Sequence, residues 1–550
     1  MPNSPVLTSL NRPLRVAHVS AGATLGAVGV TLCPGKWQRT SISGTWQRDL
    51  ATDIDALQHW GATAVVTLMP QSELQAVQAE GIGAACEARG IEWHHLPIQD
   101  VDVPDAAFET AWLYTGLRLR VHLRAGRNVL LHCRGGLGRS GTIAARLLVE
   151  LGWEAQTAIR AVRTQRPGAI ETRAQEAHVL KTQPLPRDES STARVLGCVL
   201  GGALGDAFGY AIEFDHWDAI CRQHGPRGLR EPVLQRGQLV VSDDTQMTLF
   251  TLEAMAVALP CQLSALYGET LMRPFQAACR RAYLRWGITQ GIHPSLKDAD
   301  EATLHFSPTL RQLRAPGNTC LSAVRAGATG TPVSPINQSK GCGAVMRTAP
   351  IGLIGGARPE LAMALGDAAG ALTHGHIDGW LPGGALSAMV RFIAQGEAIR
   401  PAAHQALRLL AEHPHHDRRA INACGTVRLL NIALQLLDDD APERAEIFRR
   451  LGEGWTGDEA LAIGVYAACA AGCFEDAVRL AANHDGDSDS TASIAGQLYG
   501  ARHGIMALPH AWIRRLDVLQ DALQVTRRFL NAQETESLLE HNVTTHQQGK

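Results

Sequence analysis

Residues 127–142, RNVLLHCRGGLGRSGT, decide the fold of the first part of this 550-residue chain. The apolar run that ends at Cys133 is typical of a buried strand, the glycines after it predict a tight loop, and a helix is expected to begin near Ser140. Around this stretch, apolar runs such as residues 64–69 alternate with amphipathic segments such as residues 155–162. The pattern predicts an α/β domain of about 180 residues, with a central sheet flanked by helices.

The glycine-rich loop predicts a phosphate-binding site. Small residues let successive backbone N–H groups turn inward around an anion, and the following helix adds the positive end of its dipole. Arg139 can bind two phosphate oxygens at once through its guanidinium group. We expect six consecutive residues to contact the phosphate: Arg134, Gly135, Gly136, Leu137, Gly138 and Arg139.

Cys133 lies where such a loop would make a cysteine reactive. A thiol near a helix N-terminus and a guanidinium ionises readily, so Cys133 can attack phosphorus and form a phosphocysteine. Ser140 can donate a hydrogen bond to the departing sulfur. A carboxylate in LPIQDVDVPD can protonate the leaving alkoxide, and the candidates are Asp100, Asp102 and Asp105. The alternative interpretation is that Cys133 is a small buried side chain and the glycines merely turn the chain.

Three segments of this domain resemble the cysteine-dependent dual-specificity phosphatases, especially the branch that contains cyclin-dependent kinase inhibitor 3. They are TLCPGKW at 31–37, HHLPIQD at 94–100 and LLHCRGGLGRS at 130–140. The resemblance implies that Cys133 is the nucleophile, that Arg139 binds phosphate and that Asp100 is the general acid, with Asp102 in reserve. Ser140 matches the family's hydroxyl, and no cofactor is implied. Phosphotyrosine, phosphothreonine, phosphoinositides and small phosphorylated metabolites all remain open as substrates.

The clearest boundary in the chain is KTQPLPRDESSTA at residues 181–193, whose prolines and polar run are typical of a linker. Beyond it the sequence changes to long amphipathic segments rich in Ala and Leu, such as residues 361–372 and 424–437. We predict a first domain at residues 1–182, a linker at 183–193 and an all-helical second domain at 194–540.

Two acidic clusters lie far apart in the second domain: VSDDTQMT at 241–248 and NHDGDSDSTASIAG at 483–496. Clusters with oxygen ligands alone suit hard cations such as Mg²⁺, Mn²⁺ or Ca²⁺ rather than zinc. The EF-hand pattern fails, because Ser490 and Gly496 stand where that loop needs Gly and Glu. Each cluster also precedes an apolar segment, so helix capping is the structural alternative.

Five segments of the second domain, in this order, resemble the ADP-ribosylglycohydrolase family. They are VLGCVLGGALGDAFGYAIEF at 195–214, SDDTQMT at 242–248, NQSKGCGAVMRTAPIGL at 337–353, LTHGH at 372–376 and GDSDSTASIAGQLYGA at 486–501. The resemblance implies an all-helical bundle with two divalent ions in a central cleft, usually Mg²⁺, with Mn²⁺ as the alternative. It implies six metal ligands: Ser242, Asp243, Asp244, Asp487, Asp489 and Ser490.

The same resemblance implies how ADP-ribose would be handled. Asp243 or Asp244 would activate a water for attack on the anomeric carbon, and Glu213 matches an acidic residue near the family's cleft. The glycines around residue 342 would let the backbone approach the pyrophosphate or the distal ribose. The predicted ADP-ribose contacts are Glu213, Gly341, Gly343 and Met346. Cys342 itself is interpreted as a small packing residue, because no base is evident beside it.

Composition limits the classes of function. Hydrophobic residues make up 45% and charged residues 19%, which excludes a disordered chain. A net charge of −2 provides no global basic field for nucleic acid or an acidic membrane. Twelve cysteines without a CxxC pair, a start without a secretory pattern and no apolar run long enough to span a bilayer predict a cytoplasmic protein with reduced thiols.

The sequence therefore predicts a bifunctional hydrolase that acts on phosphorylated and ADP-ribosylated proteins or small molecules. A phosphorylated ADP-ribose derivative that both sites process is one form of this hypothesis. In one alternative, either domain only binds its ligand. In another, the second domain cleaves a different N- or O-glycoside.

Overall fold

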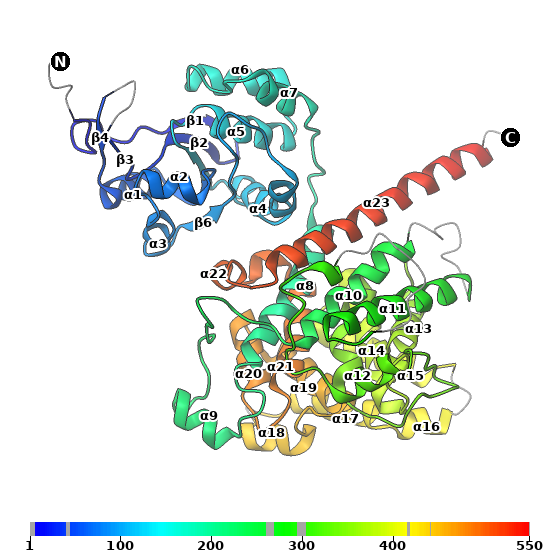
Figure 1. Ribbon diagram of the computed structural model, residues 1–550. Helices are drawn as coiled ribbons and strands as arrows, with labels where there is room; N and C mark the ends of the chain where they lie inside the picture. The colour runs from blue at the N-terminus through cyan, green and yellow to red at the C-terminus, as the bar shows by residue number, and fades with distance from the viewer. Residues whose placement is uncertain are drawn as a thin grey trace. The chain divides into compact units, whose positions relative to one another are not determined.

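The computed structural model describes residues 6–39, 44–259, 269–293, 304–414, 418–440 and 442–548. The chain divides into two compact units, Met1–Glu189 and Ser190–Lys550. The first is drawn in blue to cyan and the second in blue-green to red (Figure 1). Each unit has its own buried core.

The first unit is an α/β domain, as predicted. Its five-stranded sheet has the order β1-β2-β7-β5-β6, in which β1 pairs antiparallel with β2 and the other pairs are parallel. The strands are β1 Ala17–Ser20, β2 Ala27–Leu32, β5 Ala62–Thr67, β6 Glu92–His95 and β7 Asn128–Cys133, and β3 Trp37–Gln38 and β4 Trp46–Gln47 form a separate ribbon. The helices are α1 Leu50–His59, α2 Gln71–Ala76, α3 Ile82–Glu87, α4 Ala106–Arg124, α5 Gly138–Glu150, α6 Ala155–Gln165 and α7 Arg173–Lys181.

The sheet places the end of β7 at the centre of its carboxyl edge. β7 lies between β2 and β5, and four of its residues, 129–132, are fully buried or nearly so. The register pairs Cys133 with Leu32 of β2, and His132 with Thr67 of β5. Ligands bind beyond the carboxyl ends of parallel strands, so the loop after Cys133 occupies the expected position for a site. Helix α5 begins at Gly138, slightly earlier than the predicted start near Ser140.

The second unit is nearly all helical, as predicted. Within its described residues, extended pairing is limited to isolated bridges such as Gly341 with Thr456. The helices up to residue 371 are α8 Ser190–Gly209, α9 Trp217–His224, α10 Asp243–Ala258, α11 Glu269–Thr289, η3 Leu304–Phe306, α12 Asn318–Arg325, η4 Cys342–Arg347, η5 Ala349–Leu353 and α13 Pro359–Ala371. The remaining helices are α14 Ile377–Ala394, α15 Ile399–Ala411, α16 Arg418–Ala423, α17 Gly425–Leu436, α18 Arg444–Leu451, α19 Gly457–Ala470, α20 Phe474–Ala482, α21 Ser488–His503, η6 Ile505–Ala507, α22 His510–Ile513 and α23 Leu519–Gln548.

Helix α8 and helix α21 touch through their backbones. Four of the five glycines of α8, at positions 197, 201, 205 and 209, recur every fourth residue, so they lie on one face of the helix. A Cβ on Gly201 would lie 2.4 Å from the carbonyl oxygen of Gly496, and one on Gly205 would lie 2.0 Å from the carbonyl oxygen of Ala492. Only glycine permits this approach, which brings the start of α21 beside the end of α8.

The chain between the units differs in one detail from the predicted linker at 183–193. Helix α8 begins at Ser190, so residues 190–193 form its first turn. Glu189, the last residue of the first unit, pairs with Arg120 and Arg124 of α4 and so ties the end of that unit to its own core. No helix in the described part of the chain is both long and apolar enough to cross a bilayer.

Gly201→Ala should destabilise the second unit. Its methyl group would force α8 and α21 apart, and overpacking of a tight core costs about 1–3 kcal/mol. We expect a lower urea midpoint by far-UV circular dichroism. The matched control is Gly472→Ala, since a Cβ there meets no atom within 4 Å. Equal midpoints for the two variants would contradict this account of the packing.

Candidate active sites

The loop at the end of β7 brings the predicted nucleophile beside the predicted hydroxyl. Cys133 is 4% exposed, and its Sγ lies 3.4 Å from Oγ of Ser140, which is fully buried on α5. Both groups sit at the N-terminal end of α5, where the helix dipole favours negative charge.

The loop has the shape of an anion nest. Gly136 has φ +69°, and a Cβ there would lie 2.5 Å from the backbone carbonyl of Thr31. Arg166 donates to the carbonyl oxygens of Gly136 and Gly135 at 2.8 and 2.9 Å. Because the C=O and N–H of one trans peptide point in opposite directions, carbonyls held by Arg166 leave the following N–H groups facing the other side.

Arg139 is held in place by carboxylates and one carbonyl. Its side chain is 2% exposed. Nη1 and Nη2 donate to the two carboxylate oxygens of Glu73 at 2.9 and 3.0 Å, and Nη1 also donates to the carbonyl oxygen of Ile98. Nη2 lies 3.0 Å from the carboxylate of Asp100. The guanidinium is therefore oriented before any ligand binds.

The three predicted acids have different surroundings. Asp100 lies at Arg139 with a 61% exposed side chain, so the structure brings it to the loop. Asp102 accepts a hydrogen bond from the N–H of Val103, and Asp105 caps helix α4. Of the three, Asp100 is the one that pairs with Arg139.

Two residues that shape this loop, Glu73 and Arg166, were not predicted from the sequence. Glu73 lies on α2, which follows β5, the neighbour of β7 in the sheet. Strand adjacency is the signal that could have identified it, because the carboxyl ends of neighbouring parallel strands meet at one edge. His132 is also tied to β5, through Thr67 at 2.7 Å, and burial lowers its pKa to about 3.

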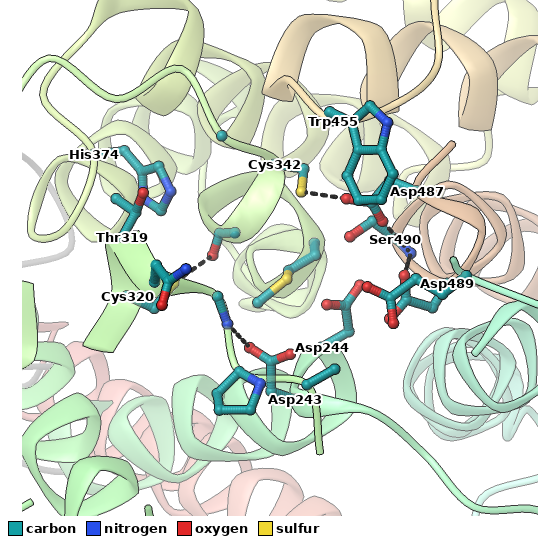
Figure 2. Close-up of a pocket in the computed structure, with 18 of the residues that line it drawn as sticks. Asp243, Asp244, Thr319, Cys320, Cys342, His374, Trp455, Asp487, Asp489 and Ser490 are labelled. Atoms are coloured by element: carbon teal, nitrogen blue, oxygen red, sulfur yellow. Dashed lines mark hydrogen bonds between the residues drawn. The ribbon is translucent and has the colours of Figure 1, made fainter. Parts of the chain in front are cut away.

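The second unit contains a cavity of about 490 Å³. This volume lies within the range of about 300–1,000 Å³ that is usual for small-molecule sites. Four aspartates from two helix starts point into it (Figure 2). The lining includes five of the six predicted metal ligands, Asp243, Asp244, Asp487, Asp489 and Ser490, and all four predicted ADP-ribose contacts, Glu213, Gly341, Gly343 and Met346.

Ser242, the sixth predicted ligand, is not among the residues that line the cavity. It is the N-cap of α10, and its hydroxyl accepts a hydrogen bond from the N–H of Asp244. Asp206 of α8, which the sequence analysis missed, accepts hydrogen bonds from the N–H groups of Ser242 and Thr245 at 2.9 and 3.0 Å. Asp206, on the neighbouring helix α8, therefore holds the start of α10 in position.

Helix α21 presents its acidic residues in the same way. Asp487 is its N-cap and accepts from the N–H of Ser490 at 3.2 Å, while Asp489 accepts from the same N–H at 2.9 Å. Asp485 lies outside this group: it accepts from the N–H of Trp217 and pairs with Arg444. Both acidic clusters therefore combine the capping role with carboxylates that reach the cavity.

Two buried carboxylate oxygens in this cavity have no hydrogen-bond partner, Oδ2 of Asp244 and Oε2 of Glu213. Burial, followed by the neighbouring carboxylates, raises the pKa of Glu213 to about 9. The same two causes raise the pKa of Asp244 and Asp489 well above the ordinary range. Concentrated, unpaired negative charge is costly unless a proton or a cation compensates it, so the donor set fits divalent cations.

Two aromatic side chains stand at the cavity, Phe214 and Trp455. They are 72% and 40% exposed, and their rings stack with centroids 6.4 Å apart. His374 lines another part of the wall, where burial lowers its pKa to about 3 and Nδ1 lies 2.8 Å from the hydroxyl of Thr373. A neutral histidine and exposed rings suit a planar ligand better than a second anion.

Cys342, interpreted from the sequence as a packing residue rather than a nucleophile, also makes a polar contact. Cys342 lines the cavity, and its Sγ donates to Oδ2 of Asp487 at 2.7 Å (Figure 2). Burial and the carboxylates of Asp487 and Asp244 raise the pKa of this thiol. This contact could not be predicted from the sequence, because residues 342 and 487 are far apart in the chain.

Comparison with known proteins gives the families of both units. The ADP-ribosylglycohydrolase family model matches residues 187–538, more than half of the chain. The chain belongs to the ADP-ribosylglycohydrolase family. A second model, the Swiss Army Knife protein DSP-PTPase phosphatase domain, matches residues 39–179. The predicted kinship of each unit is thus confirmed, and both families are hydrolases.

Individual relatives agree with this division. Cyclin-dependent kinase inhibitor 3 of Rattus norvegicus is 33% identical over 162 residues, which are 29% of this chain and 71% of that protein. Protein tyrosine phosphatase type IVA 3 of Mus musculus is 30% identical over 25% of this chain and 74% of its own length. ADP-ribosyl-[dinitrogen reductase] glycohydrolase of Rhodospirillum rubrum is 24% identical over 59% of this chain and 90% of its own length.

Glu73→Gln should weaken the phosphatase unit without unfolding it. The amide keeps the shape of Glu73 but loses the charged pair that orients Arg139, and a hydrogen bond to a charged group is worth about 1.5–3 kcal/mol. We expect kcat/KM for an aryl phosphate to fall about tenfold or more, since each 1.4 kcal/mol is a factor of ten. Glu80→Gln changes an exposed glutamate nearby and should leave the rate unchanged. Identical rates for both variants would refute the role given to Glu73.

The stability of the glycohydrolase unit without metal should fall as pH rises. Folding raises the pKa of Glu213 from its ordinary 4.5 to about 9, so the folded unit holds a proton that the unfolded chain has released. The unfolding free energy therefore decreases with pH across that window. We expect the Tm after EDTA treatment to drop by about 5 °C or more between pH 5 and pH 9.

Saturating Mg²⁺ should flatten this dependence, because the cation replaces the proton as the compensating charge. At one hundred times its Kd, the ion would add about 2.7 kcal/mol to stability. Differential scanning fluorimetry at matched ionic strength measures both effects. A Tm that rises with pH in EDTA would contradict the charge balance described for the cavity.

Proposed function

We propose that this chain removes phosphate at its first unit through a phosphocysteine and hydrolyses an ADP-ribosyl glycosidic bond at its second unit with two bound Mg²⁺ ions. The observation that carries the proposal is the convergence of four aspartates from the starts of α10 and α21 on one cavity, beside a buried glutamate. A cluster of carboxylates like this one suits hard cations, and it argues against a cavity that only binds its ligand without metal ions.

In the first unit, Cys133 acts as the nucleophile. Its sulfur attacks phosphorus, the phosphorus–oxygen bond to the leaving alkoxide breaks, and a phosphocysteine forms. The loop N–H groups and Arg139 bind the three non-bridging oxygens, whose charge the start of α5 also favours. Water then cleaves the phosphocysteine, and Ser140, 3.4 Å from the sulfur, stabilises the departing thiolate.

Asp100 acts as the general acid and then as the base. It gives its proton to the leaving alkoxide and recovers one from the attacking water, so the carboxyl group is unchanged after a full cycle. Its contact with Arg139 at 3.0 Å keeps it at the loop. An incoming phosphate dianion competes for the same guanidinium, which frees the carboxyl group to face the substrate.

In the second unit, the five predicted ligands that line the cavity would hold the two ions, with Mn²⁺ as an alternative. When bound, the pair supplies Lewis-acid polarisation and orients the ribose hydroxyls and the attacking water. Asp243 or Asp244 accepts the proton of that water, and Oδ2 of Asp244 has no other hydrogen-bond partner. Asp206 and the N–H groups at the start of α10 keep these carboxylates in position.

The rest of the cavity wall suits the remainder of ADP-ribose. Gly341 and Gly343 line the cavity without side chains, so the backbone there is open to a pyrophosphate. The exposed, stacked rings of Phe214 and Trp455 offer a surface for adenine. Glu213 lines the same cavity, where burial and the carboxylates of Asp487 and Asp243 raise its pKa.

The substrates would be phosphorylated and ADP-ribosylated proteins or small molecules. The phosphatase loop binds the phosphate group itself, whichever molecule carries it. The metal cavity selects a ribose with a leaving group at its anomeric carbon. Removal of both modifications from one target, or from one phosphorylated ADP-ribose derivative, fits two sites on a single chain.

Chelation should separate the two activities. With ADP-ribosylated peptides and an aryl phosphate as substrates, EDTA is expected to abolish release of ADP-ribose and leave phosphate release unchanged. Cys133→Ser should remove only the phosphatase activity, and Asp487→Asn should lower only the glycohydrolase activity, each by about 100-fold or more.

The matched control for Asp487→Asn is Asp485→Asn. Asp485 is in the same motif, but its side chain pairs with Arg444 outside the cavity, so this variant should keep its activity and its Mg²⁺ binding. Loss of both activities in EDTA would refute the division of labour. Metal-independent release of ADP-ribose would refute the role of the ions.

A further inference from the structure

A second cavity of the glycohydrolase unit, of about 340 Å³, is lined by residues of helices α9, α18 and α20 (Figure 1). It shares no lining residue with the metal cavity, so it lies outside the proposed catalytic site. Among the described residues that line it are four arginines and a single carboxylate: Arg227, Arg230, Arg444, Arg479 and Asp476. Four positive charges against one negative charge favour an anionic ligand.

Asn483 holds the segment that carries Arg227 and Arg230 against the rest of the unit. Its Oδ1 accepts from the N–H of Leu229 at 2.7 Å, and its Nδ2 donates to the carbonyl oxygen of Leu229 at 3.1 Å. Gly228 has φ +69°, and a Cβ there would lie 2.1 Å from Oδ1 of Asn483. The backbone that carries the two arginines therefore has a defined position at the cavity.

The other two arginines, Arg444 and Arg479, are each anchored at Nε. Nε of Arg444 donates to the carbonyl oxygen of Asn483 at 3.0 Å, and Nε of Arg479 donates to the carbonyl oxygen of Arg230 at 2.8 Å. The guanidinium of Arg444 also lies 3.7 Å from the centroid of the Trp217 ring. These contacts orient both guanidinium groups, whose Nη atoms can bind the oxygens of an oxyanion.

The carboxylates beside these two arginines hold them only weakly. Asp485 lies 3.5 Å from Arg444, while Glu231 and Asp476 lie 3.3 and 3.1 Å from Arg479. These distances exceed the 2.7–2.9 Å of a strong charged hydrogen bond. The three carboxylate side chains are between 43% and 76% exposed. Exposed ion pairs contribute little, so an incoming anion with two charges can displace them.

The positive charge of the cavity is therefore only partly balanced. Arg230 lies 4.0 Å from Asp476, and Arg227 is exposed at the cavity. Burial lowers the pKa of Arg444, and Asp485 offsets this effect only in part. A phosphate monoester carries a charge of about −1.5 to −2 at neutral pH and three terminal oxygens, which suits such a group of arginines better than a carboxylate does.

We propose that this cavity binds a phosphate monoester group, which belongs either to a small organic phosphate or to the substrate of the metal cavity. The second source is within reach because the two cavities are neighbours. Phe214 lines the metal cavity and Trp217 lines this one, so the Cα atoms of these two residues are at most about 11 Å apart. The second source rests on the proposed function, whereas the binding site itself does not.

Equilibrium dialysis of ³²P-labelled inorganic phosphate against the full chain tests the site directly. Arg139→Ala removes the guanidinium of the phosphatase loop, and EDTA removes metal ions, so neither catalytic site contributes bound phosphate. One phosphate per chain is expected, and an equal concentration of acetate should not displace it. No bound phosphate at millimolar concentration would overturn the proposal.

Three substitutions in this background locate the bound phosphate. Arg444→Gln should raise the Kd about tenfold or more, because a hydrogen bond between charged groups is lost. Arg227→Gln should also raise the Kd, and its exposed side chain can be changed without disturbing the core. Arg222→Gln is the matched control, since this exposed arginine of α9 does not line the cavity. The same Kd for all three variants would refute the proposed site.

A kinetic comparison distinguishes the two sources of the phosphate group. The substrates are an ADP-ribosylated peptide with a nearby phosphoserine and the same peptide with serine, and Cys133→Ser keeps the first one phosphorylated. If the substrate supplies the group, the phosphorylated peptide should have a KM about tenfold lower, and Arg227→Gln should remove the difference. Equal KM values assign the cavity to a small organic phosphate. Hydrolysis of neither peptide would refute the proposed function and leave the dialysis result standing.

Discussion

The backbone contact between α8 and α21 is the constraint on which the glycohydrolase site depends. The two helices approach so closely that a Cβ on Gly209 would lie 2.1 Å from the carbonyl oxygen of Ser488. At this end of the contact, Asp206 of α8 caps the start of α10, and the acidic start of α21 lies beside it. Two carboxylate groups about 240 residues apart in sequence can line one cavity because this contact brings both helix starts together.

The two units use helix N-termini for opposite purposes. In the phosphatase unit, the start of α5 and Arg139 create a positive potential that stabilises a phosphate. In the glycohydrolase unit, backbone N–H groups at the starts of α10 and α21 donate to Asp206 and Asp487, so they already compensate part of the acidic charge. The remaining charge exceeds what these N–H groups can balance, and protons or cations make up the difference.

Sequence motifs predicted both folds, and most residues that they singled out lie together in the structure, because those residues belong to contiguous segments with strict steric or chemical demands. Cys133, Arg139 and Ser140 share one loop, and the paired aspartates share two helix starts. Glu73, Asp206 and the contact of Cys342 were not predicted, because each acts through space on a residue remote in the chain. Capping aspartates and metal-binding aspartates also look alike in sequence, and only the common cavity distinguishes them.

The two sites carry opposite charge, and this difference determines how one ligand could bind to both of them. A pyrophosphate carries negative charge, so the four aspartates repel it until cations or protons neutralise them. The anion loop of the phosphatase unit needs no added cation, since its positive groups belong to the protein itself. Availability of divalent ions would thus control ADP-ribose hydrolysis while leaving phosphate hydrolysis constant. Under the proposed mechanisms, metal supply alone would therefore change the ratio of the two products.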